Sequence, residues 1–181
     1  MSQRKKIFAI VGSAGKDSAN QKLVEIVARL TSAYFDITIY NELKQLPPFD
    51  PELSITNTPK VVEDFREAIK NADGILICTP EYIFSIPAGL KNAFEWCVST
   101  VIFSDKPAGL ITASASGKKA HEELQLIMQT VMAKFTNDTT LLISGIKGKI
   151  NDKGELSDPS THEELRHFIT ALRSLTENAA S

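Results

Sequence analysis

Several features that mark whole classes of protein are missing from this chain of 181 residues. No run reaches the roughly 18 apolar residues that a membrane-spanning helix needs. The apolar stretch nearest the N-terminus, residues 7–11, is too short for the core of a signal peptide, so we expect a cytoplasmic protein. Neither sign of charge dominates, because the chain has 20 Lys and Arg and 22 Asp and Glu. This balance gives no electrostatic reason to expect binding to nucleic acid or to an anionic membrane.

Cysteine and histidine are also scarce. The two cysteines, Cys78 and Cys97, both lie in apolar surroundings, and the chain has no C-x-x-C pair. We therefore expect buried, reduced thiols. The three histidines, His121, His162 and His167, lack the spacing and the neighbouring ligands of a zinc site, so no metal site is predicted.

What the chain does contain is ordinary for a globular protein. Hydrophobic residues make up 43% of it and charged residues 23%. The length suits one domain with a substantial core, and we find no repeat, low-complexity tract or linker. We therefore expect residues 1–181 to form a single domain.

Short apolar runs predict five strands. Most of these runs show no alternation, as expected for strands of a parallel sheet that are buried on both faces. One run, residues 34–40, alternates and predicts a less buried strand. The expected strands cover residues 7–11, 34–40, 75–78, 108–113 and 141–143.

Apolar residues three and four positions apart predict five helices that alternate with these strands. The residues that mark the helices are Leu23, Ile26, Val27 and Leu30; Val61, Phe65, Ala68, Ile69 and Ala72; Leu90, Ala93, Phe94 and Cys97; Leu124, Ile127, Met128, Val131 and Met132; and Leu165, Phe168, Ile169 and Leu172. We expect loops at residues 46–51, which are rich in proline, and at residues 145–158, with a short hairpin at 151–154. The chain end after residue 176 is expected to fray.

Alternation of strand and helix indicates an α/β protein in which helices cover both faces of a parallel sheet. Right-handed crossovers leave few topologies. The flavodoxin-like order 2-1-3-4-5 is favoured, which places a switch point between the first and third strands. Ligands bind at the carboxyl ends of the strands at such a point, so the loops that follow these two strands are the candidates for function.

The loop after the first strand, Gly12–Asn20, consists of small and polar residues and leads into a helix. Ser13, Ser18 and Asn20 offer side-chain donors, and a helix start offers free N–H groups and a partial positive charge. The pattern is typical of an anion site. A plain turn in which Ser18 caps the helix is the structural alternative.

Known nucleotide motifs fit this loop unequally. Ala14 occupies the position of the second glycine in the dinucleotide fingerprint, and Asp17 follows Lys16 where a Walker loop has Ser or Thr. The string Ser13–Ser18 resembles the S-G-G-x-D-S loop of ATP pyrophosphatases, so an enzyme of that type stays open on this loop alone. A serine hydrolase is disfavoured, because residues 113–117 lack the first glycine of G-x-S-x-G.

The stretch after the third strand is more specific. It reads T-P-E-Y from Thr79, then S-I-P from Ser85 and L-K-N-A from Leu90, and it ends at Trp96. This spacing resembles the signature of the NADPH-dependent FMN reductase family, T-P-E-Y-N, S-I-P-G and L-K-N-A-I-D-W. The family's G-S-x-R-x-x-S-x-N, its Pro-rich loop and its small-residue loop after strand four also find counterparts, so the resemblance covers roughly residues 5–145.

The resemblance implies a flavodoxin-like three-layer sandwich that binds FMN and uses NAD(P)H as co-substrate. The phosphate of FMN would lie on the first loop, and the isoalloxazine ring along the third, with the loop after strand four on a third side. The cofactor-binding residues it implies are Ser13, Lys16, Ser18, Asn20, Pro80, Glu81, Tyr82, Ile83, Ser114 and Gly117. For Glu81, bracing of the loop is the alternative role.

Two positions depart from the family pattern. Gly15 replaces an arginine, which removes a bidentate phosphate clamp. A charged hydrogen bond contributes about 1.5–3 kcal/mol, so its loss predicts FMN binding weaker by roughly tenfold to a hundredfold. Lys16 can compensate as a point charge, and Asp17 opposes it. Ile83 replaces an asparagine, which removes a side-chain partner for the ring, and Phe84 adds bulk beside it.

The resulting hypothesis is an FMN-dependent NAD(P)H oxidoreductase. A hydride would pass from the nicotinamide to flavin N5 and then to a small acceptor such as a quinone, an azo compound, a metal oxyanion or free flavin. No acid or base side chain is required, so no catalytic residue is predicted. A flavin-binding module without turnover is the alternative from another class. The resemblance also suggests a homodimer or homotetramer whose partner lines the flavin pocket, with Phe84, Phe94 and Phe103 either at that interface or in the core.

Overall fold

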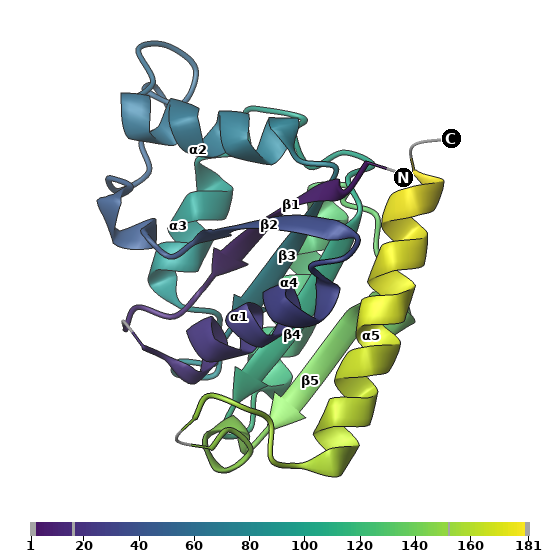
Figure 1. Cartoon of the computed structure of the whole chain (residues 1–181). Helices are drawn as coiled ribbons and strands as arrows, with labels where there is room; N and C mark the ends of the chain where they lie inside the picture. The colour runs from purple at the N-terminus through teal and green to yellow at the C-terminus, as the bar shows by residue number, and fades with distance from the viewer. Residues whose placement is uncertain (1–2, 16, 152, 180–181) are drawn as a thin grey trace.

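The computed structural model describes residues 3–15, 17–151 and 153–179. Five strands alternate with five α-helices along these residues, as predicted (Figure 1). The strands are β1 Lys5–Val11, β2 Phe35–Tyr40, β3 Gly74–Thr79, β4 Ala108–Ser114 and β5 Thr140–Ser144. The helices are α1 Ala19–Thr31, α2 Lys60–Asn71, α3 Ala88–Glu95, α4 Lys118–Thr130 and α5 Pro159–Asn178, with short 3-10 turns η1 Leu43–Gln45, η2 Asn137–Thr139 and η3 Ile146–Gly148.

All five strands are parallel, and their order is β2-β1-β3-β4-β5. The predicted order is therefore confirmed. β1 is an inner strand, because Ile7 pairs with Ile37 of β2 and with Gly74 of β3. The chain moves outward from β1 in one direction to β2 and in the other direction to β3, which places the switch point between β1 and β3.

Helices cover both faces of the sheet and give three layers (Figure 1). Alternate residues of β1 face opposite layers. Phe8 and Ile10 belong to the apolar cluster on the side of α2, α3 and α4, whereas Ile7 and Val11 belong to the cluster on the side of α1 and α5. β1, β3 and β4 therefore read as unbroken apolar runs, since both of their faces are buried.

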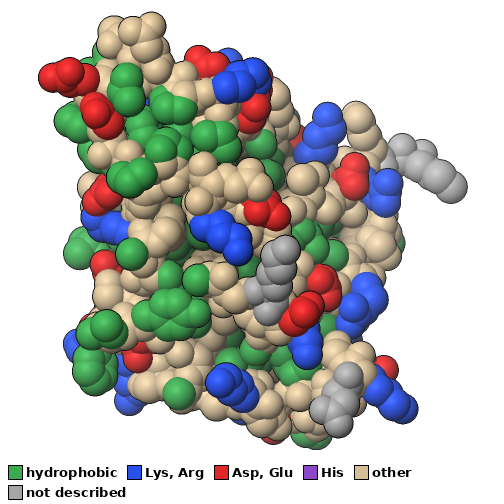
Figure 2. Space-filling model, turned by 90° about the vertical axis from the view of Figure 1, so that its left-hand side faces the viewer, with side chains coloured by type: hydrophobic (Ala, Val, Ile, Leu, Met, Phe, Trp, Pro, Cys, Tyr) green, Lys and Arg blue, Asp and Glu red, His purple; other side chains and the backbone are tan. Residues whose placement is uncertain are grey.

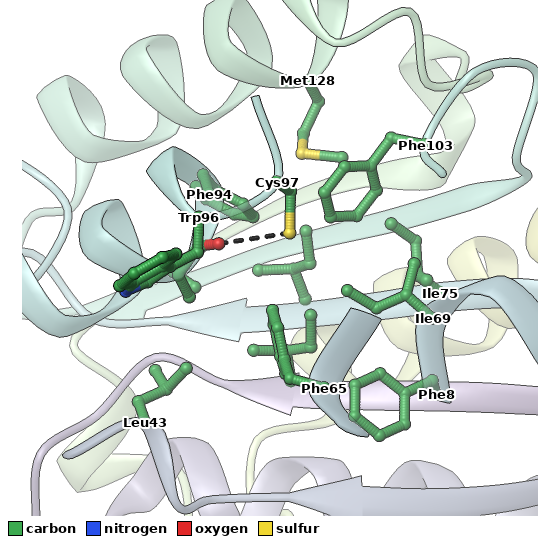
Figure 3. Close-up of a cluster of buried hydrophobic side chains, with 14 of the residues drawn as sticks. Phe8, Leu43, Phe65, Ile69, Ile75, Phe94, Trp96, Cys97, Phe103 and Met128 are labelled. Atoms are coloured by element: carbon green, nitrogen blue, oxygen red, sulfur yellow. Dashed lines mark hydrogen bonds between the residues drawn. The ribbon is translucent and has the colours of Figure 1, made fainter. Parts of the chain in front are cut away.

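Large side chains fill the layer between the sheet and α2, α3 and α4 (Figure 3). Phe65 of α2 packs against Phe8 at a centroid distance of 6.0 Å, and Phe94 of α3 packs against Phe103 at 6.1 Å. Phe94 and Phe103 are 4% and 2% exposed. Of the three phenylalanines considered for an interface, these two are therefore core residues, and Phe84 alone is exposed.

Both cysteines are free and buried, as expected. Burial raises the pKa of the Cys97 thiol to about 12, and it also raises the pKa of Cys78. The Cys97 thiol donates to the Ala93 carbonyl at 3.3 Å (Figure 3). Neither thiol is poised to ionise near neutral pH.

Some predicted boundaries differ from the structure; for example, α2 ends before Ala72 and α3 before Cys97. α4 ends at Thr130, so Val131 and Met132 lie beyond it, because Met132 adopts a left-handed conformation (φ 61°) that ends the helix. α5 continues to Asn178, past the expected fraying point. A hairpin is predicted at residues 151–154, and an antiparallel bridge between Ile150 and Leu156 flanks these residues.

None of the helices in the described part of the chain is long and apolar enough to cross a membrane.

The Pro-rich loop at residues 46–51 is irregular, as predicted, and it contacts α3 through Asn92 and Trp96.

Candidate functional site

A cavity of about 930 Å³ opens at the carboxyl ends of the central strands. The loops after β1, β3, β4 and β5 form its walls, together with the first turn of α1. The residues that line it are Ser13, Asp17, Ser18, Ala19, Asn20, Lys22, Pro80, Tyr82, Ala113, Ser114, Ala115, Gly145, Ile146, Lys147, Gly148, Ile150 and Asn151. Its position is the one that the topology predicts for a ligand.

The loop after β1 leads to a helix start that is rich in donors. Gly12 is still tied to β3, because its N–H donates to the Cys78 carbonyl at 2.8 Å. Ser18 caps α1 by accepting a hydrogen bond from the N–H of Gln21 at 3.1 Å, so its own hydroxyl hydrogen stays free to donate. The N–H groups of Ala19 and Asn20, in the first turn of α1, have no acceptor among the described residues. This end of the cavity is suited to an anion.

Asn20 plays a different part from the one expected of it. Its amide nitrogen donates to the Ala113 carbonyl of β4 at 3.1 Å, and its amide oxygen accepts from the Cys78 thiol of β3 at 3.3 Å. The side chain is buried and joins α1 to two strands. Its polar atoms are therefore engaged within the protein, and it holds the start of α1 in place beside the cavity.

The loop after β3 forms a tight hairpin. Tyr82 and Ser85 exchange two backbone hydrogen bonds of 2.9 and 3.1 Å, and Ile83 and Phe84 form the tip. Both tip residues have positive φ, 51° and 57°, which matches a type I′ turn. The left-handed region costs an L-residue about 1–2 kcal/mol and is rare for a β-branched side chain. Ile83 and Phe84 are 95% and 78% exposed, so the tip combines backbone strain with exposed apolar surface.

Two carboxylates hold this hairpin on α4. Glu81 accepts from the N–H groups of Gly117, Lys119 and Ala120 at 3.2, 2.9 and 3.0 Å, and so caps the helix start. The hydrogen bond from Ala120 is the main cause that lowers the pKa of the Glu81 carboxyl, and those from Gly117 and Lys119 add to it. From α4, Glu123 accepts from the Ser85 hydroxyl at 2.7 Å.

The first and third loops meet across the cavity. The Ser13 and Tyr82 hydroxyl oxygens lie 3.4 Å apart, at the long end of the range for a hydrogen bond. Pro80 and Tyr82 provide flat apolar surface on the wall, while the backbone N–H groups of Glu81, Ile83 and Phe84 have no acceptor within the described ranges. Phe84 does not line the cavity, so it leaves the space between Ser18 and Tyr82 open.

The loops after β4 and β5 close the remaining sides. The Ser114 hydroxyl donates to the Glu81 carbonyl at 3.5 Å, and the Ser114 carbonyl accepts from Gly145 at 2.8 Å. Gly145 leads into η3, which Ile146 anchors through a buried side chain. From the sequence alone, residues 145–158 are predicted to form a surface loop. Since β5 is parallel to its neighbours, its carboxyl end also reaches this edge, and the topology was the one signal that could have identified this wall.

The predicted cofactor-binding residues fall into three groups. Ser13, Ser18, Asn20, Pro80, Tyr82 and Ser114 line the cavity. Glu81, Ile83 and Gly117 do not, because Glu81 and Gly117 bond to each other at the start of α4 and Ile83 points into solvent. Lys16 lies outside the described residues. The structure adds Asp17, Lys22 and the η3 segment, which sequence reasoning missed.

The helical half of the motif after β3 has a structural role. Asn92 accepts from the N–H of Phe49 at 2.8 Å and donates to the Pro47 carbonyl at 3.0 Å. The indole N–H of Trp96 donates to that same carbonyl at 2.7 Å. The Asn and Trp of the motif therefore hold the Pro-rich loop against α3, away from the cavity.

The residues present fit a phosphorylated planar ring. The volume is within the range of small-molecule sites, about 300–1,000 Å³. One end offers free N–H groups and a hydroxyl to a phosphate, and the opposite wall offers an aromatic face and a proline to a flat ring. The arrangement presents no described pair of side chains placed as nucleophile and base.

Comparison with known proteins gives one family. The chain matches the family described as NADPH-dependent FMN reductase over residues 5–147. It is 28% identical over 178 residues to the quinone reductase of Escherichia coli strain K12, a match that covers 94% of this chain and 95% of the relative. It is 31% identical over 179 residues to the NADPH:quinone oxidoreductase of Arabidopsis thaliana, with 94% and 91% covered.

A solved structure supports the fold. FerB of Paracoccus denitrificans, described as a flavoenzyme NAD(P)H:(acceptor) oxidoreductase, superposes with a TM-score of 0.77. The match covers 97% of this chain and 98% of that one at 23% sequence identity. The likeness is one of fold, and it extends over the whole sheet and both helical layers.

Proposed function

The chain belongs to the NADPH-dependent FMN reductase family, and we propose that it is an oxidoreductase that binds FMN in the cavity at the carboxyl edge of its sheet. NAD(P)H is its co-substrate. The string at Ser13–Ser18, which by itself also resembles a pyrophosphatase loop, lies within the family match. We also propose that residues 1–181 act as one FMN-binding domain.

The observation that carries this proposal is the meeting of the first and third loops around one cavity. Ser18 at the start of α1 and Tyr82 after β3 line the same space, although 64 residues separate them. A phosphate on α1 and a ring along Pro80 and Tyr82 would occupy the two ends of that space. Both ends have the chemistry that the corresponding part of FMN needs.

The residues of the chain act by positioning. The start of α1 would hold the phosphate through free N–H groups and the Ser18 hydroxyl. Glu81 and Glu123 hold the hairpin that carries Tyr82, whose aromatic side chain would contact the ring. When bound, FMN supplies hydride transfer between the nicotinamide and an acceptor. The proton that a quinone takes up with the hydride can come from water, so the rate would depend mainly on how well the two loops orient the ring.

We propose a quinone as the acceptor. The support is the naming of the relatives: proteins that match over 94% of this chain are called quinone reductase and NADPH:quinone oxidoreductase. Azo compounds, metal oxyanions and free flavin are the other acceptors to compare. A panel of these compounds, assayed at equal concentration with FMN-loaded protein, should give the highest kcat/KM for a quinone.

The test is flavin reduction. We expect protein, FMN and NADPH mixed without oxygen to lose the visible absorbance of oxidised flavin, and a quinone to restore it. NADH is tried in parallel. A stable FMN complex that neither nicotinamide reduces would instead favour a flavin-binding module without turnover. Absence of any FMN complex would contradict the proposal.

We further propose that the protein is a cytoplasmic homodimer or homotetramer. The support is exposed apolar surface beside the site: Ile83, Phe84 and, on α4, Leu126 are 95%, 78% and 63% exposed. Figure 2 shows hydrophobic side chains reaching the surface on the side of the molecule where α2 and α3 lie. Sedimentation of the purified protein and of Phe84→Asp should give a larger mass for the unchanged chain.

A further inference from the structure

Apart from Lys16, which lies outside the described residues, the loop after β1 has no positively charged side chain. Gly15 stands where the arginine of the family pattern is found, and a Cβ built on it meets no atom within 4 Å. Asp17 lines the cavity and brings a negative charge. A phosphate monoester carries about −1.5 to −2 charges at neutral pH, so cations on the other walls of the cavity would stabilise an anion bound there.

Lys22 lies one helical turn after the cap of α1. Its backbone N–H donates to the Ser18 carbonyl at 3.0 Å, which places the two residues on one face of the helix. Side chains of an α-helix lean toward its N-terminus, so the Lys22 side chain runs back toward Ser18 and the free N–H groups. It is half-buried and lines the cavity.

Lys147 lies on the opposite wall. η3 carries it, and the fold fixes η3 through the buried Ile146 and through Gly145, which donates to the Ser114 carbonyl. Lys147 is exposed at the mouth of the cavity. Among the described residues, Lys147 is thus the second cation, after Lys22, that lines this space.

Neither lysine is engaged in an ion pair with a described residue. Other lysines of the chain are so engaged; those paired with a carboxylate are Lys60, Lys70, Lys91, Lys119 and Lys149. Lys22 and Lys147 are therefore available to an anionic ligand without first breaking an internal contact.

We propose that Lys22, assisted by Lys147, neutralises the phosphate of FMN. The two lysines would thus replace the arginine of the family pattern, which is Gly15 in this chain. The inference rests on the proposed FMN site. Lys22 provides the larger share, because it is half-buried and lies behind the donors of α1. Lys147 provides the smaller share, because water and salt screen an exposed charge.

Comparison of FMN with riboflavin isolates the phosphate, because riboflavin has the same ring and lacks that group. Quenching of flavin fluorescence gives Kd for both ligands with the unchanged protein and with Lys22→Gln, Lys147→Gln and Lys134→Gln. The last variant is the control, because Lys134 is exposed and lies far from the cavity. Its carbonyl accepts a hydrogen bond from the N–H of Ala108 at the amino end of β4, which is the opposite edge of the sheet.

We expect Lys22→Gln to raise Kd for FMN about tenfold and to leave riboflavin unchanged. Lys147→Gln should raise Kd for FMN about threefold, and Lys134→Gln should change neither ligand. Added salt should weaken FMN binding less in Lys22→Gln than in the unchanged protein. Gly15→Arg in the Lys22→Gln background should restore FMN affinity, because the position has open space.

Three results would overturn the inference. Equal weakening of FMN and riboflavin in Lys22→Gln would show that the lysine only supports the structure. Unchanged FMN affinity in both cavity variants would show that neither lysine meets the phosphate. If the unchanged protein binds neither flavin, the proposed function fails and this inference fails with it. If FMN binds tightly and Lys22→Gln does not change its Kd, this inference alone is contradicted.

Discussion

The loops after β1 and β3 follow neighbouring strands at the same edge of the sheet, yet they differ in how many hydrogen bonds hold them. The β3 loop is fastened by a two-residue hairpin, by Glu81 on the start of α4 and by Glu123 from within α4. In the β1 loop, the described residues between Gly12 and Ser18 have one long contact, from Ser13 to Tyr82. The β3 loop is therefore preorganised, whereas fewer hydrogen bonds hold the described residues of the β1 loop.

This difference matches the two ends of the proposed ligand. A planar ring needs a rigid wall, because orientation governs hydride transfer. A phosphate tail is held by several donors and by charge, so it tolerates a looser loop. Strain at Ile83 and Phe84 is retained in the rigid loop, where the surrounding hydrogen bonds determine the backbone conformation.

The largest effect is expected at Gly12, the first residue of the β1 loop, where the backbone packs closely against Thr79. In Gly12→Ala the new Cβ would lie 2.4 Å from Thr79 Oγ1 and 2.7 Å from Thr79 Cβ, both in a buried side chain. Overpacking of this kind costs about 1–3 kcal/mol, so we expect a loss near the upper end in the free energy of unfolding. Denaturant titration measures it.

Gly15→Ala is the matched control, because a Cβ at that position has no neighbour within 4 Å. It should leave the free energy of unfolding nearly unchanged. Equal stability of the two variants would mean that Gly12 is not packed as described, and the contrast within this loop would be lost.

The next effect concerns the brace of the β3 loop. Glu81→Ala leaves the N–H groups of Lys119 and Ala120 without an acceptor, and loss of a helix cap costs about 1–2 kcal/mol. The pKa of Glu81 is lowered in the folded state, so its contribution is fully present above the unfolded pKa and is lost as pH falls through the folded pKa. The two proteins should therefore approach equal stability at acid pH.

Glu122→Ala serves as the control for that experiment. Glu122 is on the same helix and pairs with Lys119 on the surface, where both side chains are more than 60% exposed. Such a pair contributes little, so its removal should have a small effect at every pH. A loss for Glu122→Ala as large as that for Glu81→Ala would contradict the assignment of Glu81 as the brace.

The smallest effect has the opposite sign. Ile83→Asn should stabilise the protein by up to about 1 kcal/mol, because asparagine tolerates the left-handed conformation that isoleucine does not. Ile55→Asn is the control, since Ile55 is also exposed, at 77%, and has no positive φ. A melting temperature that rises for neither variant would show that the tip is not strained.

Much of the fold could be predicted from the sequence. The unbroken apolar runs of β1, β3 and β4 indicated strands buried on both faces, and alternation with helical stripes indicated the parallel order. The proline and small residues that follow β1 and β3 located the edge at which the cavity lies. These signals are local in the sequence, so they can be recognised without knowledge of how the helices and strands pack.

The rest depended on contacts between distant residues. Glu81 caps a helix that begins 37 positions later, at Lys118, and no local pattern announces such a bond. Ile83 and Phe84 form a type I′ turn without the glycine or asparagine that signals one. The η3 wall was missed because charge and glycine at residues 145–158 indicate only a surface loop, while its role follows from where β5 ends.

If FMN binds across these two loops, the backbone amide shifts in NMR spectra recorded with and without FMN will report it. We expect shifts for residues 12–20 and 81–86 and for the η3 wall at residues 145–151. Amides at the amino edge, such as those of Lys106 and Ala108, should not move. Shifts confined to another face, or no shifts at saturating FMN, would contradict it.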